Sequence, residues 1–249
     1  MTDRDALLAL CRTLGEPARD LVLSAEGNVS MRLDDHTMTI KASGCSLATM
    51  GDDDLVDVDL PTVLALLDGD PSDDRTKDAY RAAVRSSTDK MPSVEAVLHA
   101  VLYEITPAQV IAHTHPTAIN MLTCSANVAL LVEGSLFPDA IVMLGPRQVL
   151  VPYTDPGVLL AKAVRQAVST FMAEEGEAPK VIYLANHGLF VAAESVRQAL
   201  QVTEMAVKNA RILHGTLAAG GPRFLPPDQI DRIHQRPDEA HRRRALHAE

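Results

Sequence analysis

The chain has 249 residues, enough to bury a large hydrophobic core, and with no evident linker it is expected to fold as one domain. Apolar residues make up 47% of the sequence and charged residues 22%, so a disordered or collagen-like chain is excluded. Acidic residues outnumber Lys and Arg by 33 to 23, and the net charge of −10 opposes broad electrostatic binding to nucleic acids or anionic membranes. Any anionic ligand is therefore expected to bind at a local site.

The cysteines and the N-terminal segment indicate the cellular location of the protein. Cys11, Cys45 and Cys124 are an odd set with no C-x-x-C spacing, so neither a disulfide framework nor a thiolate zinc site is expected. The N-terminal segment has acidic residues near its start and only a short apolar stretch, unlike a secretory signal, and no run of 18 apolar residues occurs. These features predict a cytoplasmic protein.

The N-terminal part of the chain predicts a helix followed by a β-hairpin. Apolar positions at helical spacing indicate a helix over residues 4–14, which ends before Gly15. Residues 27–40 alternate in polarity around a polar turn, which is typical of a hairpin that leads into residues 41–44.

The middle of the chain predicts two helices and a buried strand. Residues 60–67 have the pattern of a short helix, and the polar segment after Pro71 has the composition of a loop. A second helix is expected from residue 92, with Ser93 as its cap and one face buried. The continuous apolar run 110–112 is typical of a buried strand, and it leads into the sequence HTHP.

The later part of the chain alternates apolar runs with helix patterns. Residues 140–153 hold two apolar runs separated by a Gly-Pro pair, and a long helix is expected from residue 157 to about 172. Residues 181–191 have a strand pattern that is broken by Asn-His-Gly, and helical periodicity resumes over residues 194–217.

Strands and helices alternate along residues 1–225, which predicts a single α/β domain whose sheet is covered by helices. Residues 226–249 are polar, with three consecutive arginines near the end, and are expected to form a peripheral tail. The sequence contains no internal repeat and no low-complexity tract.

Two histidines, His113 and His115, follow the apolar run of the predicted buried strand. Residues two apart on a strand point to the same face with α-carbons about 6.5 to 7 Å apart, and this separation lets both imidazoles reach one metal ion. The pattern is short, and a pair of polar residues at a strand end also fits it. His187 ends another apolar strand and precedes Gly188, so it is the candidate third ligand.

Glu95 in the expected second helix has two interpretations. A glutamate in the first turn is favoured by the helix dipole alone. Beside a metal, the same carboxylate can remove a proton from a carbon or oxygen whose acidity the cation raises. His99 follows four residues later and can pair with Glu95 on one helix face. The remaining histidines are expected to be ordinary polar residues: His36, His214, His234, His241 and His247.

Three segments carry small polar residues of the kind that bind anions. Gly27-Asn28 and Ser43-Gly44 supply backbone amides and short side chains in two turns, and Ser93 stands at an expected helix N-terminus. Each of them alone is also an ordinary turn or cap residue. In combination they predict a phosphate cradle.

Five short motifs occur in the order GNVS, IKASG, PSVE, HTHP and ANHG. In this order they resemble the class II aldolase and adducin head family, and the resemblance spans about residues 5–220. It implies a three-layer α/β/α domain, in which helices cover a central, mainly antiparallel sheet. The segments 137–139 and 151–157 are most similar to the aldolase part of fused rhamnulose-phosphate aldolase and dehydrogenase proteins.

The resemblance implies that His113, His115 and His187 bind zinc or another first-row divalent ion such as Mn²⁺ or Co²⁺, and that Glu95 exchanges a proton with the substrate. The implied enzyme is a class II, zinc-dependent aldehyde-lyase. It would cleave a small ketose phosphate to a dihydroxyacetone-phosphate-like ketone and an aldehyde through a metal-bound enediolate, as a cytoplasmic homotetramer. The residues implied to hold the substrate phosphate are Asn28, Ser43, Gly44 and Ser93.

Two positions depart from the family pattern. Fuculose-phosphate aldolases have a serine at the position of Val94, so one expected phosphate contact is missing. The segment after HTHP has no tyrosine before Tyr153, and therefore the family's catalytic tyrosine has no counterpart there. Asp139, or a residue of a neighbouring subunit, is the candidate acid that protonates the aldehyde oxygen.

Other functions are compatible with the same residues. Related members of the family epimerise ribulose phosphate, dehydrate methylthioribulose phosphate or decarboxylate, and the fold does not choose between these reactions. A non-catalytic interaction domain, as in the adducin head, is the remaining alternative. The intact set of three histidines and Glu95 favours an enzyme over that alternative.

Overall fold

The structure is a computed structural model that describes residues 2–69 and 72–237. Within these residues seven strands form one sheet in the order β3-β2-β1-β4-β7-β6-β5. The strands are β1 (Asn28–Arg32), β2 (Thr37–Lys41), β3 (Leu55–Asp59), β4 (Val110–Thr114), β5 (Val149–Val151), β6 (Val181–Leu184) and β7 (Gly188–Ala193). The α-helices are α1 (Asp3–Leu14), α2 (Leu60–Leu64), α3 (Asp73–Ala83), α4 (Ala96–Ile105), α5 (Thr117–Thr123), α6 (Pro138–Leu144), α7 (Val158–Glu175), α8 (Val196–Ala218) and α9 (Pro227–Gln235).

The sheet is mainly antiparallel, as predicted. Every neighbouring pair of the seven strands runs antiparallel except β5 and β6, which are parallel. The predicted hairpin over residues 27–40 forms β1 and β2, and the broken strand pattern over residues 181–191 forms the hairpin of β6 and β7. The periodicity of these segments was therefore a sufficient guide to their local structure.

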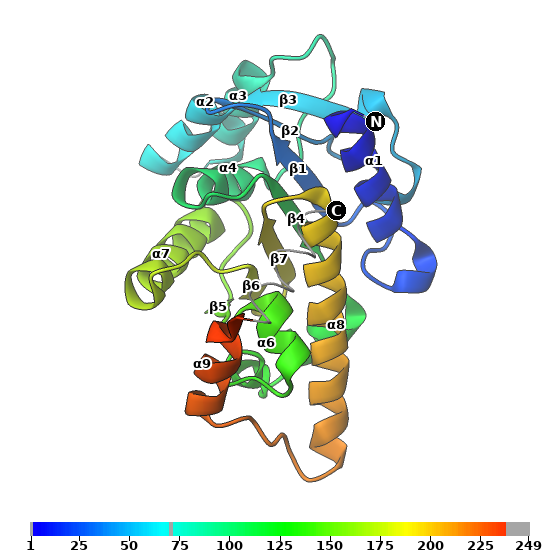
Figure 1. Cartoon of the computed structure of the whole chain (residues 1–249). Coiled ribbons are helices and arrows are strands. Elements are labelled where there is room, and N and C mark those ends of the chain that lie inside the picture. Colours follow the sequence, from blue (N-terminus) through cyan, green and yellow to red (C-terminus); the bar gives the residue numbers. More distant parts are fainter. Residues whose placement is uncertain (1, 70–71, 238–249) are drawn as a thin grey trace.

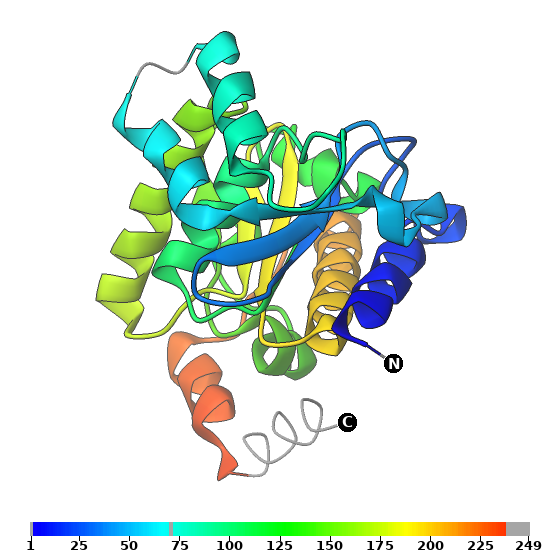
Figure 2. The same cartoon turned by 90° about the horizontal axis from the view of Figure 1, so that it is seen from above.

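Helices cover both faces of the sheet (Figure 1). The helices α1 and α8 lie on one face and α4 and α7 on the other, and the view from above shows the sheet between them (Figure 2). On β4, Ile111 packs into the core on the α4 and α7 side, whereas its neighbours Val110 and Ala112 pack into the core on the α1 and α8 side. This alternation follows from the two-residue period of a strand, and it confirms the expected three layers.

The helix α4 is buried on all sides between the sheet and α7. It begins at Ala96, one turn later than the sequence predicts, because the Ser93 hydroxyl accepts a hydrogen bond from the Glu95 N–H before the first helical residue. Glu95 is therefore the residue that precedes the helix. The predicted inner face is confirmed, and its members are fully buried: Val97, Leu98, Val101 and Leu102.

The prediction of a loop after Pro71 is wrong for most of that segment, which forms α3. This helix is polar overall, but it buries Tyr80 and Ala83 in the core, and Tyr80 also bonds to the loop before α4. The Tyr80 hydroxyl donates to the Val94 carbonyl at 3.0 Å and accepts from the Val97 N–H at 3.1 Å. Composition alone misses such a helix because tertiary contacts stabilise it.

The first part of the expected polar tail is also helical. Helix α9 packs against α6, at the lower end of the molecule in Figure 1. The rest of the tail, including the three arginines, lies outside the described residues. The apolar side chains buried between α9 and α6 are Ile141, Val142, Ile230 and Ile233.

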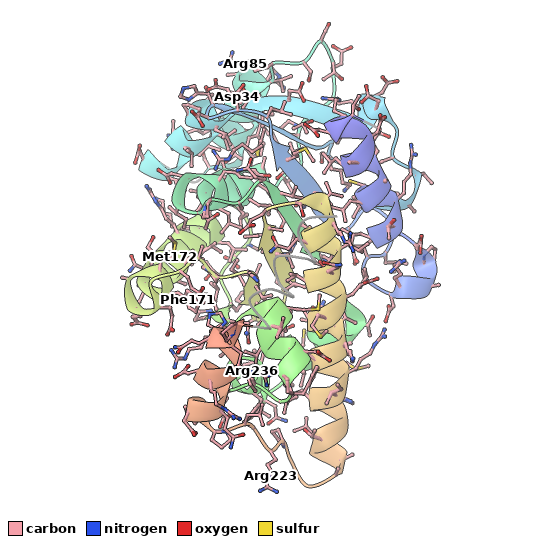
Figure 3. The ribbon with its side chains drawn as sticks, viewed as in Figure 1. Asp34, Arg85, Phe171, Met172, Arg223 and Arg236 are labelled. Carbon is pink, nitrogen blue, oxygen red and sulfur yellow. The ribbon has the colours of Figure 1, made fainter. Side chains whose placement is uncertain are left out.

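The molecule is elongated along α8. In Figure 3, Asp34 in the β1–β2 turn and Arg85 after α3 lie at one end, and Arg223 after α8 lies at the other. Among the described helices, none combines the length and the apolar character needed to cross a bilayer. The three cysteines are free thiols, in agreement with the absence of a predicted disulfide framework.

Candidate metal centre

Three histidines converge at one end of the central strands. His113 lies on β4, His115 follows β4, and His187 lies in the turn between β6 and β7. Because β4 pairs with β7, with His113 opposite Phe190, this turn comes beside the end of β4. One ring nitrogen of each histidine lies within 4.8 Å of the other two. The structure thus brings together the three histidines that the sequence singled out.

The ring of His113 is fixed by two contacts. Its Nδ1 hydrogen-bonds to the Leu189 carbonyl at 3.0 Å, and Phe190 stacks on it with ring centroids 4.1 Å apart. A ring whose Nδ1–H donates to a carbonyl presents Nε2 as its ligand atom, and this Nε2 lies 2.8 Å from Nε2 of His115. Nitrogens bound to one tetrahedral zinc are about 3.3 Å apart. The donor set therefore fits a first-row divalent ion.

His115 is held in the neutral form that a metal requires. Burial, together with the neighbouring His113 and His187, lowers the pKa of His115 to about 3. The Glu26 carboxylate lies 3.8 Å from its Nδ1, on the side away from His113. Because metal ligands must be deprotonated, such a ring can bind a cation without first releasing a proton at neutral pH.

Two glycines let the backbone approach the histidines. A Cβ on Gly188 would lie 2.6 Å from the Thr114 carbonyl oxygen and 2.7 Å from Cδ2 of His115. A Cβ on Gly27 would lie 2.7 Å from the His113 carbonyl oxygen, and Gly27 has a φ of +66°. Gly188 thus permits the close approach of the β6–β7 turn to β4, and Gly27 has a similar role on the other side of β4.

The Glu95 carboxylate contacts two of the three histidines. Its Oε2 lies 3.2 Å from Nε2 of His113, and its Oε1 lies 3.2 Å from Nε2 of His187. The Asn28 amide donates to the same Oε2 at 2.7 Å. Burial alone would raise the pKa of the Glu95 carboxyl, but His113 and His187 hold that pKa well below its ordinary value. Glu95 is therefore a buried carboxylate at the centre of the cluster.

Two of the predicted anion-binding segments lie side by side. The Ser43 N–H donates to the Met91 carbonyl at 2.9 Å, and the Ser93 N–H donates to the Lys41 carbonyl at 2.9 Å. These bonds bring the exposed turn at Ser43 and Gly44 next to the buried Ser93. Val94, at the position of the missing serine, is 67% exposed.

Lys41 joins the third segment to these two, although no sequence pattern singled it out. Its Nζ donates to the Ala25 carbonyl at 2.8 Å and to the Gly27 carbonyl at 2.9 Å, and the residue is 2% exposed. Burial lowers the pKa of Lys41. The available signal was a lysine within the otherwise uncharged motif IKASG, because a lysine is rarely buried unless its ammonium has partners.

Asn28 is placed differently from Ser43 and Gly44. Its side chain is 3% exposed, and both ends of the amide are bonded, one to Glu95 and the other to Nε2 of His99. The predicted acid Asp139 lies on a separate element, in the first turn of α6. Tyr153, the first tyrosine after HTHP, is exposed and donates its hydroxyl hydrogen to Asp155 at 3.1 Å.

A cavity of about 480 Å³ opens beside the metal cluster. His115 lines it together with Asp20, Glu26, Asn120 and Met121. Cavities of this size hold small molecules, so a substrate can reach His115 from solvent.

Comparisons with known proteins show which family and fold this chain resembles. A sequence model of the class II aldolase and adducin N-terminal domain matches residues 5–214. The uncharacterized oxidoreductase YuxG of Bacillus subtilis is 28% identical over 223 residues, which cover 83% of this chain but only 30% of that protein. The 3-oxo-tetronate 4-phosphate decarboxylase of Haemophilus influenzae is 25% identical over 240 residues, which cover 95% of this chain and 99% of that protein.

Solved structures share the fold. An L-fuculose 1-phosphate aldolase has a TM-score of 0.70 and 22% identity, with 94% of each chain covered. YgbL of Klebsiella pneumoniae, described as an aldolase, epimerase or decarboxylase, has a TM-score of 0.70 and 23% identity, with 94% of this chain and 99% of that chain covered. At these identities the likeness shows a common architecture, on which more than one reaction is found.

Proposed function

Because the chain belongs to the class II aldolase and adducin N-terminal domain family, we propose that it is a metal-dependent aldolase that cleaves a small ketose phosphate to a ketone and an aldehyde. The observation that carries this proposal is the position of Glu95. Its carboxylate lies 3.2 Å from each of two histidines of a three-histidine cluster. An interaction domain without catalysis has no need for a desolvated carboxylate at a metal site.

The residues of the cluster suit the chemistry. A divalent ion held by His113, His115 and His187 would polarise the carbonyl of the substrate and acidify the neighbouring C–H bond. Glu95 then has the role of moving a proton at that carbon. It returns the proton to the ketone fragment in cleavage and removes it in synthesis. Its burial excludes water, which would otherwise compete for the same proton.

A loaded cluster would bring positive charge to the site. The divalent ion would add two positive charges and the Lys41 ammonium adds one, beside the negative charges of Glu95, Glu26 and Asp20. Charges interact strongly in a partly desolvated region, so the bound ion would attract an anionic group of the substrate. The turn at Ser43 and Gly44 lies next to Ser93, and the two serine hydroxyls are the groups it would offer to a phosphate, because the N–H groups of Ser43 and Ser93 already donate to backbone carbonyls.

A decarboxylase is the second candidate, and one comparison favours it. The relative named as a 3-oxo-tetronate 4-phosphate decarboxylase matches this chain over 95% of its length and is itself covered over 99%. Loss of CO₂ from a 3-oxo acid phosphate also produces a carbanion that must be protonated, so the same carboxylate and the same anion site would serve.

The test is a product screen with the zinc-loaded enzyme on a panel of ketose phosphates and 3-oxo acid phosphates. An aldolase releases an aldehyde and a three-carbon ketone phosphate, whereas a decarboxylase releases CO₂. Replacing Glu95 with Gln is expected to abolish turnover and leave zinc bound, because the amide fills the same space but cannot accept the proton. Full activity of this variant would remove Glu95 from the mechanism.

Metal content per chain tests the cluster itself. Elemental analysis of protein purified without chelator is expected to find about one ion per chain, and the double variant His113→Ala, His115→Ala is expected to lose it. No metal after incubation with zinc would refute the proposed function. Zinc as the native ion, a homotetrameric assembly, a cytoplasmic location and Asp139 as the second acid stay predictions.

A further inference from the structure

A chain of buried polar side chains runs from Glu95 into the core. The Asn28 amide bonds to Glu95 at 2.7 Å and to Nε2 of His99, and Nδ1 of His99 lies 2.6 Å from the Ser30 hydroxyl. The Ser30 hydroxyl in turn lies 2.8 Å from the hydroxyl of Tyr103. All five residues are buried. Ser30, His99 and Tyr103 belong neither to the metal cluster nor to the predicted phosphate site.

This series of hydrogen-bonded side chains lies between β1 and α4. Asn28 and Ser30 are two apart on the strand and share a face, whereas Glu95, His99 and Tyr103 recur every fourth residue along the helix. Two strand residues span about 6.6 Å and four helical residues about 6 Å, so the two series stay in register. The spacing N-x-S on the strand and E-x-x-x-H-x-x-x-Y on the helix is thus one structural unit.

The chemistry of the groups determines the direction of the hydrogen bonds from Ser30 to Glu95. An ionised carboxylate only accepts, so the Asn28 amino group donates to Glu95 and the Asn28 carbonyl faces His99. His99 must then donate from Nε2. A neutral imidazole has one donor and one acceptor, so its Nδ1 accepts from Ser30. The Tyr103 hydroxyl has two acceptors within reach, the Ser30 oxygen at 2.8 Å and the Gln109 carbonyl at 3.4 Å. From Ser30 to Asn28, every donor points toward Glu95.

His99 has the protonation state that this direction requires. Burial lowers the pKa of His99 to about 3, so the ring is neutral at physiological pH. Its edge packs against Phe190, the same ring that stacks on His113, with centroids 5.4 Å apart. The ring is therefore held in place by packing as well as by hydrogen bonds.

We propose that His99 is a positioning residue for the acid–base step: it holds the Asn28 amide with its amino group toward Glu95, and so fixes the carboxylate between His113 and His187. The proposal rests on the proposed function of Glu95. Without the Nε2–H donor of His99, the Asn28 amide can rotate and present its carbonyl oxygen to Glu95. The carbonyl oxygen and the Glu95 carboxylate then repel each other, and the carboxylate is displaced. A base displaced by about 1 Å loses about a hundredfold in rate.

Two nearly isosteric substitutions distinguish the roles of the two ring nitrogens of His99. The amide nitrogen of Gln in His99→Gln stands near the place of Nε2 and can donate to Asn28, whereas Asn in His99→Asn reaches only the place of Nδ1. The matched control is Thr203→Val, which removes a buried hydroxyl that bonds to the Ala199 carbonyl at 2.7 Å within α8. This control tests the effect of losing a buried hydrogen bond elsewhere in the core.

The kinetic measurement is the exchange of substrate hydrogen of dihydroxyacetone phosphate with D₂O, catalysed by the zinc-loaded enzyme. We expect kcat for exchange to fall about a hundredfold in His99→Asn and less than tenfold in His99→Gln, with KM and zinc content unchanged in both. Thr203→Val is expected to match the wild type. Equal losses in the two His99 variants, or losses in KM or zinc content alone, would overturn the proposal.

A double-mutant cycle adds a second criterion. Asn28→Ala removes the donor to Glu95 directly, so the double variant Asn28→Ala, His99→Asn should exchange no more slowly than Asn28→Ala alone. Additive losses would show that His99 acts by another route. This comparison does not depend on how strongly either substitution alters stability.

A spectroscopic test needs no variant and no substrate. Nitrogen-15 NMR of the zinc-loaded wild type should show His99 as a neutral ring with its proton on Nε2 and with no titration between pH 5 and pH 8. A proton on Nδ1 would reverse the chain and refute the proposal. A wild type that binds zinc but exchanges no hydrogen would instead refute the proposed function, while the NMR result would still decide the direction of the chain.

Discussion

Replacement of Gly27 by Ala tests how the backbone beside the metal cluster is built. Gly27 has a φ of +66°, and a Cβ at this position would lie 2.7 Å from both the His113 carbonyl oxygen and Cγ1 of Val22. Two costs therefore add: the strain of a left-handed conformation and the steric clash with β4. Two other glycines in the chain carry one cost each.

Gly44 and Gly188 are these matched controls. Gly44 has a φ of +80°, and no atom lies within 4 Å of the position that a Cβ would take, so Gly44→Ala carries the strain without a clash. Gly188 lies outside the left-handed region, but its Cβ would lie 2.6 Å from the Thr114 carbonyl oxygen, so Gly188→Ala carries the clash without the strain. Left-handed strain costs about 1 to 2 kcal/mol and overpacking about 1 to 3 kcal/mol.

The expected loss in free energy of unfolding is therefore about 1 to 2 kcal/mol for Gly44→Ala, about 1 to 3 kcal/mol for Gly188→Ala and about 2 to 5 kcal/mol for Gly27→Ala. The assay is urea denaturation followed by far-UV circular dichroism, since the chain has no tryptophan. Chelator is present throughout, because a bound metal would stabilise the native state by mass action.

The order of the three losses in free energy of unfolding shows whether the steric clash with β4 contributes. If Gly44→Ala destabilises as much as Gly27→Ala, the clash with the His113 carbonyl has no energetic weight. If Gly188→Ala is neutral, the close approach of the β6–β7 turn to β4 is not tightly constrained. Either result would contradict the view that these two glycines fix the spacing between the histidines.

Two further predictions concern the histidines. His187→Ala removes one of the three nitrogen ligands and is expected to lower zinc occupancy. The control His214→Ala, on the exposed side of α8, is expected to keep full occupancy. Equal zinc occupancy in the two variants would refute the ligand assignment. The metal-free protein is expected to lose stability as pH falls below 6.5, because unfolded His99 binds a proton near its ordinary pKa of 6.5 and folded His99 only near 3. The contribution is about 1.4 kcal/mol per pH unit over that range, and a His99→Gln variant with the same pH slope as the wild type would contradict it.

The sequence by itself determined the local structure around the site. The two-residue period of β4 places His113 and His115 on one side, and the Asn-His-Gly interruption predicts the turn that carries His187. These features depend on neighbouring residues only, and for this reason they could be predicted. The five motifs in their order added the family and the ligand set, which periodicity alone does not supply.

Local patterns failed where distant contacts decide the structure. Helix α3 is polar, and its Tyr80 is buried against the loop before α4, so its composition resembled a loop. Helix α9 buries two isoleucines against α6, a contact that no local pattern in a polar segment reveals. In both cases burial by a distant segment stabilises a helix whose own propensity is weak.

Only the tertiary structure decided what the polar residues near the site do. Asn28 has the sequence context of an anion-binding turn, but the packing of β1 beside α4 directs its side chain to Glu95 and His99. Lys41 looks ordinary in the sequence, and His99 is indicated there only as a partner of Glu95 on the same helix. Each becomes significant because the fold buries it next to groups far away along the chain. A hydrogen bond depends on distance and direction within tenths of an ångström, which residue spacing along the chain does not encode.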